Sequence, residues 1–290
     1  MAGLNVIKKR INTVQSIRKI THAMELVAAS KLKRAKNEYD TVKAYEESIV
    51  NTFNLIINHL THSEAVKLFP VINAKARLFI VLTGDFGLAG SYNANVIKLA
   101  KKTIKKDDLI ILIGSKGIHA LESLYPNQIL ATLNSEQNED HYQMMQDVMK
   151  VVYEHYSLKE VNSVNIIYNK YINNLVQEEI SEQIMPITIG KLGLVCENGS
   201  CDKSLTSTIE FEPSPRQVLS TAIPLYLTSQ LYKAYSSAKL SELASRRSAM
   251  ETATDNADNL TTDLNIKYNR RRQSNITQEL NEIVAGADAV

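Results

Sequence analysis

One segment has the residue types that a nucleotide site uses: the glycine-rich run Gly84–Gly90 (GDFGLAG), between a predicted strand and a predicted helix. A dinucleotide fingerprint has the spacing Gly-x-Gly-x-x-Gly and an acidic residue at the end of the second strand to hold the ribose. Here the spacing is Gly-x-x-Gly-x-x-Gly, and the nearby acids Asp107 and Asp108 precede the second strand. A P-loop would need Gly-Lys followed by Ser or Thr, which this run lacks. The run therefore predicts a structural turn rather than a phosphate-binding loop.

Other side chains that could perform catalysis are not spaced for it. None of the six histidines forms a His-x-x-x-His pair, no serine lies in a nucleophile elbow, and neither cysteine has an evident histidine partner. Acidic residues that are adjacent in a helix point in different directions, so we expect such pairs to be solvated. The pairs are Glu46 and Glu47, Asp107 and Asp108, and Glu178 and Glu179. The sequence therefore predicts no catalytic residue, no cofactor and no metal site.

The two cysteines, Cys196 and Cys201, lie close together in a loop-like run. A zinc site would need two more ligands at suitable spacing, which the sequence does not offer. Without a secretory signal, a structural disulfide is not the default interpretation. We expect incidental loop thiols, with a redox-sensitive pair as the alternative.

Short apolar runs and amphipathic stretches alternate in the middle of the chain. Arg77–Leu82 and Leu109–Ile113 are typical of strands buried on both faces. Strands that alternate with helices are typical of an α/β domain with a mainly parallel sheet. The expected strands are Arg77–Leu82, Leu109–Ile113, Val164–Tyr168 and Ile184–Ile189, and the expected helices are Asn93–Lys105, Ser115–Leu124 and Asp140–His155.

Both ends of the chain are free of helix breakers over long stretches. No Gly or Pro occurs between Leu4 and Phe69, and Pro224 is the only one from Arg216 to Ala285. At about 1.5 Å per residue, even the first fifty residues of the first stretch could form a helix of about 75 Å, and the second stretch could form one of about 105 Å. A compact chain of this size has a radius of gyration of only ~19 Å. In each stretch, apolar residues recur at the steps of three and four that are typical of a coiled-coil seam. The predicted seam residues are Leu4, Ile7, Ile11, Val14, Ile17, Ile20, Met24, Val27 and Leu32 in the first, and Leu240, Leu243, Met250, Ala257, Leu260, Leu264, Tyr268, Ile276, Leu280, Ile283 and Val284 in the second.

These patterns predict the domain organisation. Each seam is too narrow to be stable alone, so we expect the two helices to pair as an antiparallel coiled coil. The segments are an N-terminal coiled-coil helix at 1–69, a central Rossmann-like α/β domain with a mainly parallel sheet at 70–207, and a C-terminal coiled-coil helix at 208–290. The predicted fold class is α/β with this long coiled coil added.

Basic residues are concentrated near the N-terminus, although the formal net charge is only +2. From Leu4 to Lys36 there are nine Lys or Arg residues against one acid, Glu25. The basic N-terminal face comprises Lys8, Lys9, Arg10, Arg18 and Lys19. Such a run is either a solvated helix face or a contact surface for an acidic protein or nucleic acid. No run approaches the ~18 apolar residues of a membrane span, and no presequence is evident, so we expect a soluble chain.

Several motifs carry a specific resemblance. The N-terminal motif is Lys19–Lys31 (KITHAMELVAASK), and the C-terminal motifs are Ala253–Ala257 (ATDNA) and Tyr268–Val284 (YNRRRQSNITQELNEIV). Pro213–Pro215 and Pro224–Leu227 mark the entry into the C-terminal helix. In these motifs, and in their order along the whole chain, the sequence resembles the gamma subunit family of F-type ATP synthases, of the bacterial type.

The resemblance implies a function in ATP synthesis and hydrogen ion transport. The two helices would form a rotor shaft inside three alpha and three beta subunits, coupling ion-driven rotation of a c-ring to ATP synthesis or hydrolysis in that head. The α/β domain would contact the epsilon subunit and the c-ring. One non-catalytic copy would serve each complex, bound peripherally at the cytoplasmic face of the bacterial plasma membrane, without nucleic acid.

The resemblance also implies which residues couple rotation to catalysis. They are Met24 on the N-terminal helix, and Arg246, Arg272, Gln273, Thr277 and Glu279 on the C-terminal helix. The sequence departs from the family at Gly84, Phe86 and Ala89, where Ser, Arg and Cys are usual, and at Arg247, where an apolar residue is usual. Cys196 and Cys201 are similar to the regulatory thiols of chloroplast relatives, but the insertion that carries those is absent.

Two other classes of function compete with the rotor. The first alternative is a coiled-coil scaffold or nucleic-acid-binding adaptor that uses the basic N-terminal face, for which steeply salt-dependent DNA binding would be the signature. The second is a dinucleotide-binding enzyme, which the glycine spacing disfavours.

Overall fold

The computed structural model describes residues 2–58, 72–135, 140–187, 212 and 214–287. The chain divides into a terminal unit, Met1–Lys31 with Arg246–Val290, and a central unit, Leu32–Ser245. Two long helices, α1 (Ala2–Asn58) and α6 (Pro215–Ala287), contribute to both units. The predicted boundaries at 69/70 and 207/208, and both cysteines, lie outside the described residues.

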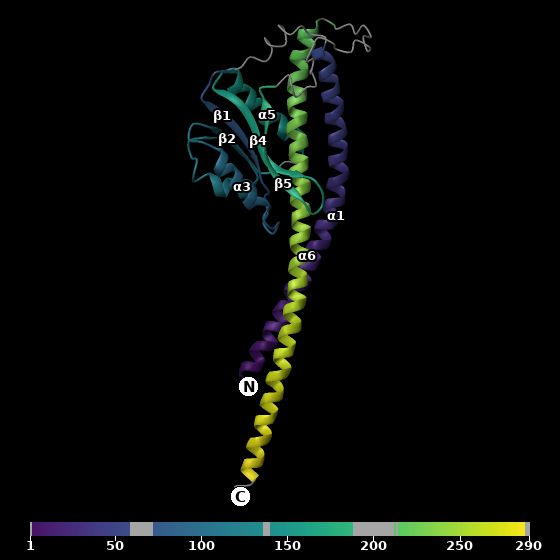
Figure 1. The fold of residues 1–290 in the computed structure, drawn as a ribbon, viewed down its shortest axis with the longest axis vertical. Helices are drawn as coiled ribbons and strands as arrows, with labels where there is room; N and C mark the ends of the chain where they lie inside the picture. The colour runs from purple at the N-terminus through teal and green to yellow at the C-terminus, as the bar shows by residue number, and fades with distance from the viewer. Residues whose placement is uncertain (1, 59–71, 136–139, 188–211, 213, 288–290) are drawn as a thin grey trace, which may run out of the picture. The chain divides into compact units, whose positions relative to one another are not determined.

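A five-stranded sheet forms the middle of the central unit (Figure 1). Its strand order is β3-β2-β1-β4-β5, with β5 antiparallel to β4 and all other neighbours parallel. The strands are β1 Ala76–Leu82, β2 Leu109–Ile113, β3 Ile129–Leu133, β4 Val161–Tyr171 and β5 Gln177–Met185. The shorter helices are α3 Tyr92–Thr103, α4 Ser115–Leu121 and α5 His141–Ser157. The predicted α/β class with a mainly parallel sheet is confirmed.

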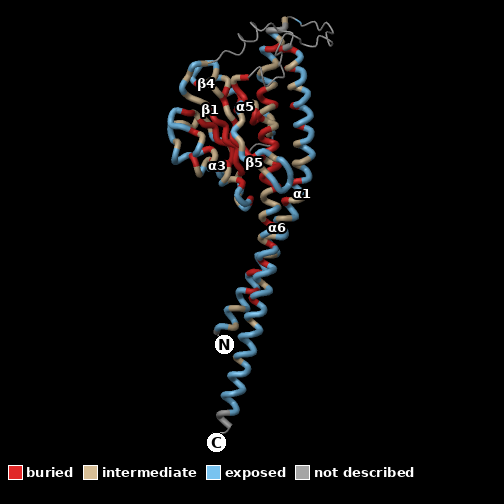
Figure 2. The backbone as a smooth tube through the Cα atoms, viewed as in Figure 1, coloured by how far each residue is buried: buried red, intermediate tan, exposed pale blue. Residues whose placement is uncertain are grey.

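Helices cover both faces of this sheet. On one face, α3 and α4 pack against Phe79 and Val81 of β1. On the other face, α5 and the central-unit parts of α1 and α6 pack against Leu78 and Ile80. Because alternate residues of a strand point to opposite faces, a strand covered on both sides must be apolar at successive positions. Figure 2 shows the resulting concentration of buried residues in the sheet.

Two strands differ from the sequence-based expectation. The strand Ile129–Leu133 was not expected, because it lies at an edge and is only partly buried, so it lacks a long apolar run. At the other edge, Gln177–Met185 is longer than expected and begins well before the predicted strand Ile184–Ile189. This strand contains the consecutive residues Glu178 and Glu179, which are both exposed, so it lacks a clear apolar alternation. These two residues are solvated as predicted.

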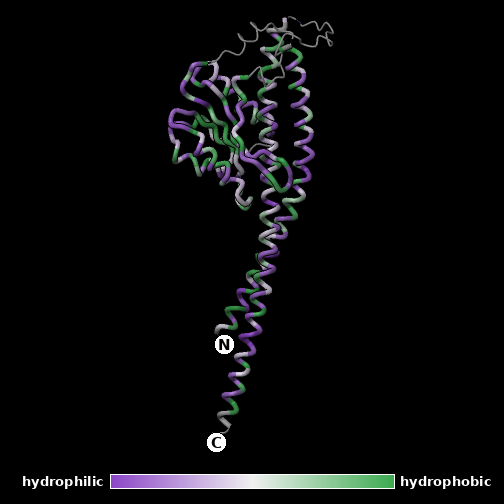
Figure 3. Tube along the Cα trace, viewed as in Figure 1, coloured by the Kyte–Doolittle hydropathy of each residue, from purple (hydrophilic) through white to green (hydrophobic). Residues whose placement is uncertain are grey.

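The helices α1 and α6 run antiparallel within each unit. In the central unit, Leu32 packs with Leu240, while further along α1 the Phe53 ring stacks on Tyr226 with ring centroids 4.4 Å apart. As α1 proceeds from Leu32 to Phe53, its contacts on α6 move back from Leu240 to Tyr226, so the two helices run in opposite directions. The predicted antiparallel pair is confirmed. Figure 3 shows hydrophobic and hydrophilic residues alternating along both helices, as a narrow seam requires.

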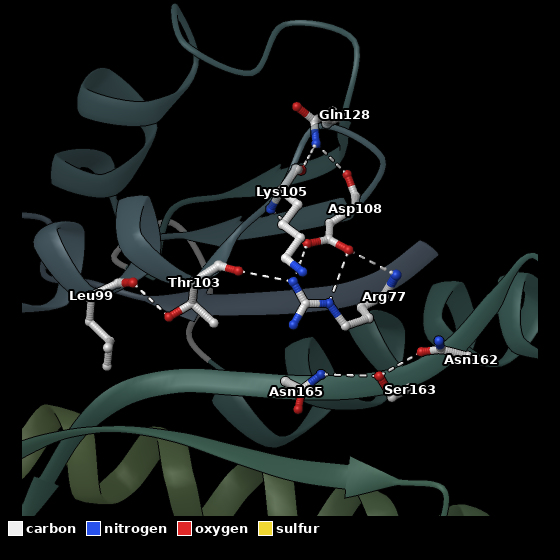
Figure 4. Close-up of polar contacts among 9 residues, drawn as sticks. All are labelled: Arg77, Leu99, Thr103, Lys105, Asp108, Gln128, Asn162, Ser163 and Asn165. Carbon is white, nitrogen blue, oxygen red and sulfur yellow. Dashed lines mark hydrogen bonds and ion pairs between the residues drawn. The ribbon is translucent and has the colours of Figure 1, made fainter. Parts of the chain in front are cut away.

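A buried acidic residue joins the amino ends of three strands (Figure 4). Asp108 is only 2% exposed, so its predicted solvation alongside Asp107 is wrong. Its carboxylate accepts hydrogen bonds from Arg77 Nη2 and from the backbone N–H of Lys105, each at 2.7 Å. The Gln128 side chain, just before β3, donates to the Asp108 backbone carbonyl at 2.6 Å. The pairing rule for helices does not apply here, because Asp108 precedes a buried strand and faces a cation on the neighbouring strand.

A second acidic residue expected to be solvated is also buried. Glu46 on α1 is 4% exposed, whereas its neighbour Glu47 is exposed. Lys233 Nζ lies 2.9 Å from the Glu46 carboxylate, and Gln230 Nε2 donates to it at 2.5 Å. The face of α1 that carries Glu46 therefore meets α6, and the carboxylate links the two helices within the central unit.

Candidate partner-contact surface on the terminal helices

In the terminal unit, α1 and α6 bury a narrow apolar seam. Its apolar cluster comprises Ile11, Val14, Ala257 and Leu264. Further along α1, the Thr21 and Thr254 hydroxyls form a hydrogen bond of 2.8 Å. Arg18 Nε donates to Asp258 at 2.8 Å beside them. These contacts fix the register of the pair and leave the remaining faces of both helices exposed.

The seam on α1 does not follow all the apolar residues that the sequence-based prediction placed in it. After Val14 it continues at steps of four and three through half-buried or buried positions: Arg18, Thr21, Glu25 and Ala28. Four predicted seam residues are exposed instead: Ile17 (49%), Ile20 (59%), Met24 (40%) and Val27 (56%). The prediction is wrong here because it followed residue type, whereas the heptad geometry sets the buried positions.

We call Ile17, Ile20, Met24 and Val27 the apolar stripe of α1. Their spacing of three and four places them on one face of the helix. An apolar surface that a soluble protein leaves exposed in a continuous patch commonly marks a protein contact. This stripe is the feature of the site that sequence reasoning missed. The signal was available, since α1 has more apolar residues than a two-helix seam can bury.

The six contact residues implied by the sequence motifs fall at two levels of the helix pair. Met24 belongs to the apolar stripe, and Arg246 is half-buried at the start of this unit's part of α6. The others are exposed near the far end of α6: Arg272, Gln273, Thr277 and Glu279. Arg246 and Arg272 are separated by about 39 Å along the helix, at about 1.5 Å per residue. The structure therefore does not bring the six residues into one cluster.

The basic residues near the N-terminus are distributed around α1 rather than along a single face. Lys8, Lys9 and Arg10 are consecutive, so their side chains point in three directions. They and Lys19 are exposed, and none of these four forms an ion pair with another described residue. Arg18 differs, because its hydrogen bond to the Asp258 carboxylate raises the pKa of Arg18. Four cations thus remain available to an acidic partner.

The last part of α6 carries a second group of exposed apolar residues. Tyr268 packs beside Ile7, so α1 reaches its first residue within about two turns of that point. Beyond it, α6 continues without α1 alongside, as Figure 1 shows at the C-terminal end. The exposed residues there are Ile276 (47%), Leu280 (57%), Ile283 (68%) and Val284 (59%). They were also predicted as seam residues, and that prediction is wrong because the partner helix ends first.

The glycine-rich run Gly84–Gly90 forms a turn at the carboxyl end of β1. The Asp85 carboxylate accepts hydrogen bonds from the Ser115 backbone N–H at 2.9 Å and from the Ser135 hydroxyl. Burial alone would raise the pKa of Asp85, but these hydrogen bonds outweigh it and lower the pKa. The contacts fit the predicted structural turn. Among the described residues, no cluster of His, Cys, Asp or Glu could hold a metal ion.

Comparison with known proteins identifies the family. A protein-family model described as ATP synthase matches residues 3–290. The ATP synthase gamma chain of Mycoplasmopsis agalactiae is 44% identical over 291 residues, covering 100% of both chains. That of Mycoplasmopsis synoviae is 42% identical over 291 residues, covering 100% of this chain and 99% of the relative. The chain belongs to the ATP synthase gamma chain family. The resemblance noted in the helix motifs is thereby confirmed.

Solved structures from two mitochondrial ATP synthases share the fold. The rotor of the Euglena gracilis mitochondrial ATP synthase matches with a TM-score of 0.66 at 16% identity, covering 95% of this chain and 99% of that one. The central stalk and c-ring structure from Tetrahymena thermophila matches with a TM-score of 0.61 at 23% identity, covering 81% and 99%. At such identities the likeness establishes the fold alone.

Membership of the gamma chain family makes this chain a non-catalytic subunit of ATP synthase. In the part of the chain that the structure describes, no helix has the length and apolar content to cross a membrane.

Proposed function

We propose that this chain is the central rotor shaft of an F-type ATP synthase, coupling ion-driven rotation of a membrane ring to ATP synthesis or hydrolysis in the catalytic head. The observation that carries the proposal is the apolar stripe of α1. The helix pair has already buried its seam, so these side chains stay exposed among the described residues of the terminal unit and fit an enclosing protein surface. The fold shared with structures named as a rotor and as a central stalk supports this assignment.

The proposed complex contains one copy of this chain. Three alpha and three beta subunits would surround the terminal unit, while the epsilon subunit and the c-ring would contact the central unit. In terms of sequence, 1–69 and 208–290 supply the shaft helices and 70–207 supplies the α/β domain. Such a subunit would be held peripherally at the cytoplasmic face of the bacterial plasma membrane, through the complex.

We assign the coupling contacts to two levels of the shaft. The first comprises Met24, which belongs to the apolar stripe of α1, and Arg246, which is half-buried at the start of the terminal unit's part of α6. At the other level lie four exposed residues whose side chains include hydrogen-bond donors and acceptors: Arg272, Gln273, Thr277 and Glu279. Guanidinium groups can bind carboxylates in a bidentate manner, so the arginines would meet acidic segments of the head. Lys8, Lys9, Arg10 and Lys19 would add long-range attraction toward the same acidic surface.

Co-purification tests the proposal directly. The chain would be co-expressed with the alpha and beta subunits of its own organism, and the complex weighed by native mass spectrometry. One copy of this chain with three of each partner, together with rotation-dependent ATP hydrolysis, is the expected result. Failure to bind an assembled hexamer would contradict it. Tight, steeply salt-dependent DNA binding would instead favour the nucleic-acid adaptor.

A further inference from the structure

The strand order of the sheet creates a crevice of the kind that usually binds ligands. From β1 the chain proceeds outward to β2 and β3, and then returns to place β4 on the other side of β1. In open α/β sheets, ligands bind beyond the carboxyl ends of the strands at the point where the order reverses. In this chain that point lies beyond Leu82 at the end of β1 and Tyr171 at the end of β4.

The helix α6 occupies this position through directional contacts from several elements. Tyr92 Oη, at the start of α3, donates to the Ala238 backbone carbonyl at 3.0 Å. The Tyr171 backbone N–H, at the end of β4, donates to Ser237 Oγ at 2.9 Å. Asn169, which is 3% exposed, fixes Tyr92 by donating from Nδ2 to its backbone carbonyl at 3.0 Å. The crevice thus presents hydrogen-bonding groups to one short segment of α6.

Shape complementarity accompanies these hydrogen bonds. A Cβ atom at Gly84, on the turn after β1, would lie only 2.8 Å from Glu242 Oε1, and Glu242 is 2% exposed. At the start of β5, the Gln177 side-chain oxygen accepts a hydrogen bond from Ser245 Oγ at 2.9 Å. The α6 residues that enter the crevice are small and buried: Ala234, Ser237, Ala238 and Ser241. Small side chains let the helix backbone approach the ends of the strands.

We propose that this crevice is a binding site for the chain's own helix, in which residues 237–245 of α6 are locked against rotation about the helix axis. The hydrophobic effect is non-directional, so it specifies the orientation of a helix about its axis less sharply than hydrogen bonds do. Hydrogen bonds have narrow geometric limits, and those from α3, β4 and β5, together with the close approach of the turn after β1, hold α6 from several directions. Building on the proposed rotor function, Tyr92, Asn169, Ser237 and Glu242 are positioning residues that make the α/β domain turn together with α6.

A bulky substitution in the crevice tests the lock in the assembled complex. Ser241 is 0% exposed, so Ser241→Leu overpacks the contact, whereas Ser220→Leu makes the same change at an exposed position of α6. In purified complexes of Ser241→Leu, ion transport per ATP hydrolysed should fall to roughly half or less, with hydrolysis itself retained. The Ser220→Leu complex should match the wild type. A wild-type transport ratio in Ser241→Leu would overturn the proposal.

A milder variant keeps the test decisive if Ser241→Leu fails to assemble. Ser237→Ala removes the acceptor of the Tyr171 amide, which should then exchange its hydrogen about three- to tenfold faster. The double variant Ser237→Ala with Tyr92→Phe should lower ion transport per ATP hydrolysed. The control double variant, Ser220→Ala with Tyr125→Phe, should leave it unchanged. If the Tyr171 amide hydrogen exchanged faster while ion transport per ATP hydrolysed stayed unchanged, the contact would be weakened without any effect on coupling. That result would refute the inference. If the wild-type chain fails to bind a hexamer, the proposed function fails instead.

Discussion

At the amino ends of the parallel strands, the Asp108 carboxylate accepts hydrogen bonds from the Arg77 guanidinium and the Lys105 backbone N–H. Replacing it by a neutral amide would turn part of that acceptor into a donor. Arg77, whose side chain is only 28% exposed, would lose its counter-charge. We expect Asp108→Asn to lower the free energy of unfolding of the full-length chain by about 2–3 kcal/mol, allowing for partial solvent screening of Arg77.

Urea denaturation followed by circular dichroism measures this loss. Asp107→Asn is the matched control, because Asp107 is adjacent and exposed, and should change the free energy by less than about 0.5 kcal/mol. Equal stability of the two variants would show that the carboxylate has no structural role.

A second prediction at the residue scale concerns Met24 in the apolar stripe of α1. Met24→Lys would put an ammonium group on a surface proposed to meet acidic segments of the beta subunits. The new ion pair should hold the shaft at one angular position, so ATP-driven proton pumping should fall more than ATP hydrolysis. Met24→Leu conserves volume and apolarity and should pump normally. Unchanged pumping in Met24→Lys would count against the contact.

At the scale of elements, the turn after β1 should make stability depend on pH. Hydrogen bonds lower the pKa of Asp85 in the folded chain, against an unfolded value of about 3.9. Its stabilising effect is therefore fully present above about pH 4 and is lost as the pH falls through the lower folded pKa. Asp85→Asn should be less stable than the wild type at pH 6, and the difference should shrink below about pH 4.

Unfolding free energies measured at several pH values give this comparison. Glu179→Gln, which removes an exposed carboxylate from β5, should show no such convergence. A constant difference between Asp85→Asn and the wild type down to pH 3 would mean that the carboxylate does not titrate below its unfolded value.

The terminal helices should depend on each other for their structure. The seam of the terminal unit is narrow, and its apolar cluster among the described residues has four buried members: Ile11, Val14, Ala257 and Leu264. We expect an isolated segment of residues 2–58 to be only partly helical as a monomer in dilute buffer. Adding the segment 215–287 should raise its helicity, as measured by circular dichroism. Full helicity of the isolated monomer would contradict this dependence.

Sequence patterns predicted those elements whose environment is uniform. The strands β1 and β2 are buried on both faces, so their apolar runs were unambiguous. Both edge strands were harder, because β3 is only partly buried and β5 is mostly polar. The coiled coil was predicted but its seam was misassigned at Ile17, because residue type and heptad position disagree there. Burial of Asp108 could not be predicted, since it depends on a cation in another strand.

At the scale of the whole molecule, the exposed apolar residues at the end of α6 should matter only in the complex. Leu280 and Ile283 are 57% and 68% exposed, so Leu280→Ser with Ile283→Ser should change the stability of the isolated chain by less than about 1 kcal/mol. Association with the hexamer should weaken, as measured by the concentration needed for assembly. Leu264→Ser, at a position 5% exposed, should instead destabilise the chain itself by about 2–4 kcal/mol. If the Leu280→Ser, Ile283→Ser double variant and the Leu264→Ser variant lost similar amounts of unfolding free energy, the prediction would be contradicted.

The occupied crevice of the sheet also bears on small molecules. Because α6 is covalently tethered to the strands that it contacts, it competes for the crevice at an effective concentration on the order of millimolar or higher. A diffusible compound directed at this position would have to displace a helix that cannot leave. Compounds meant to act on this subunit are therefore better aimed at its outward contact surfaces than at the pocket that its fold class would suggest.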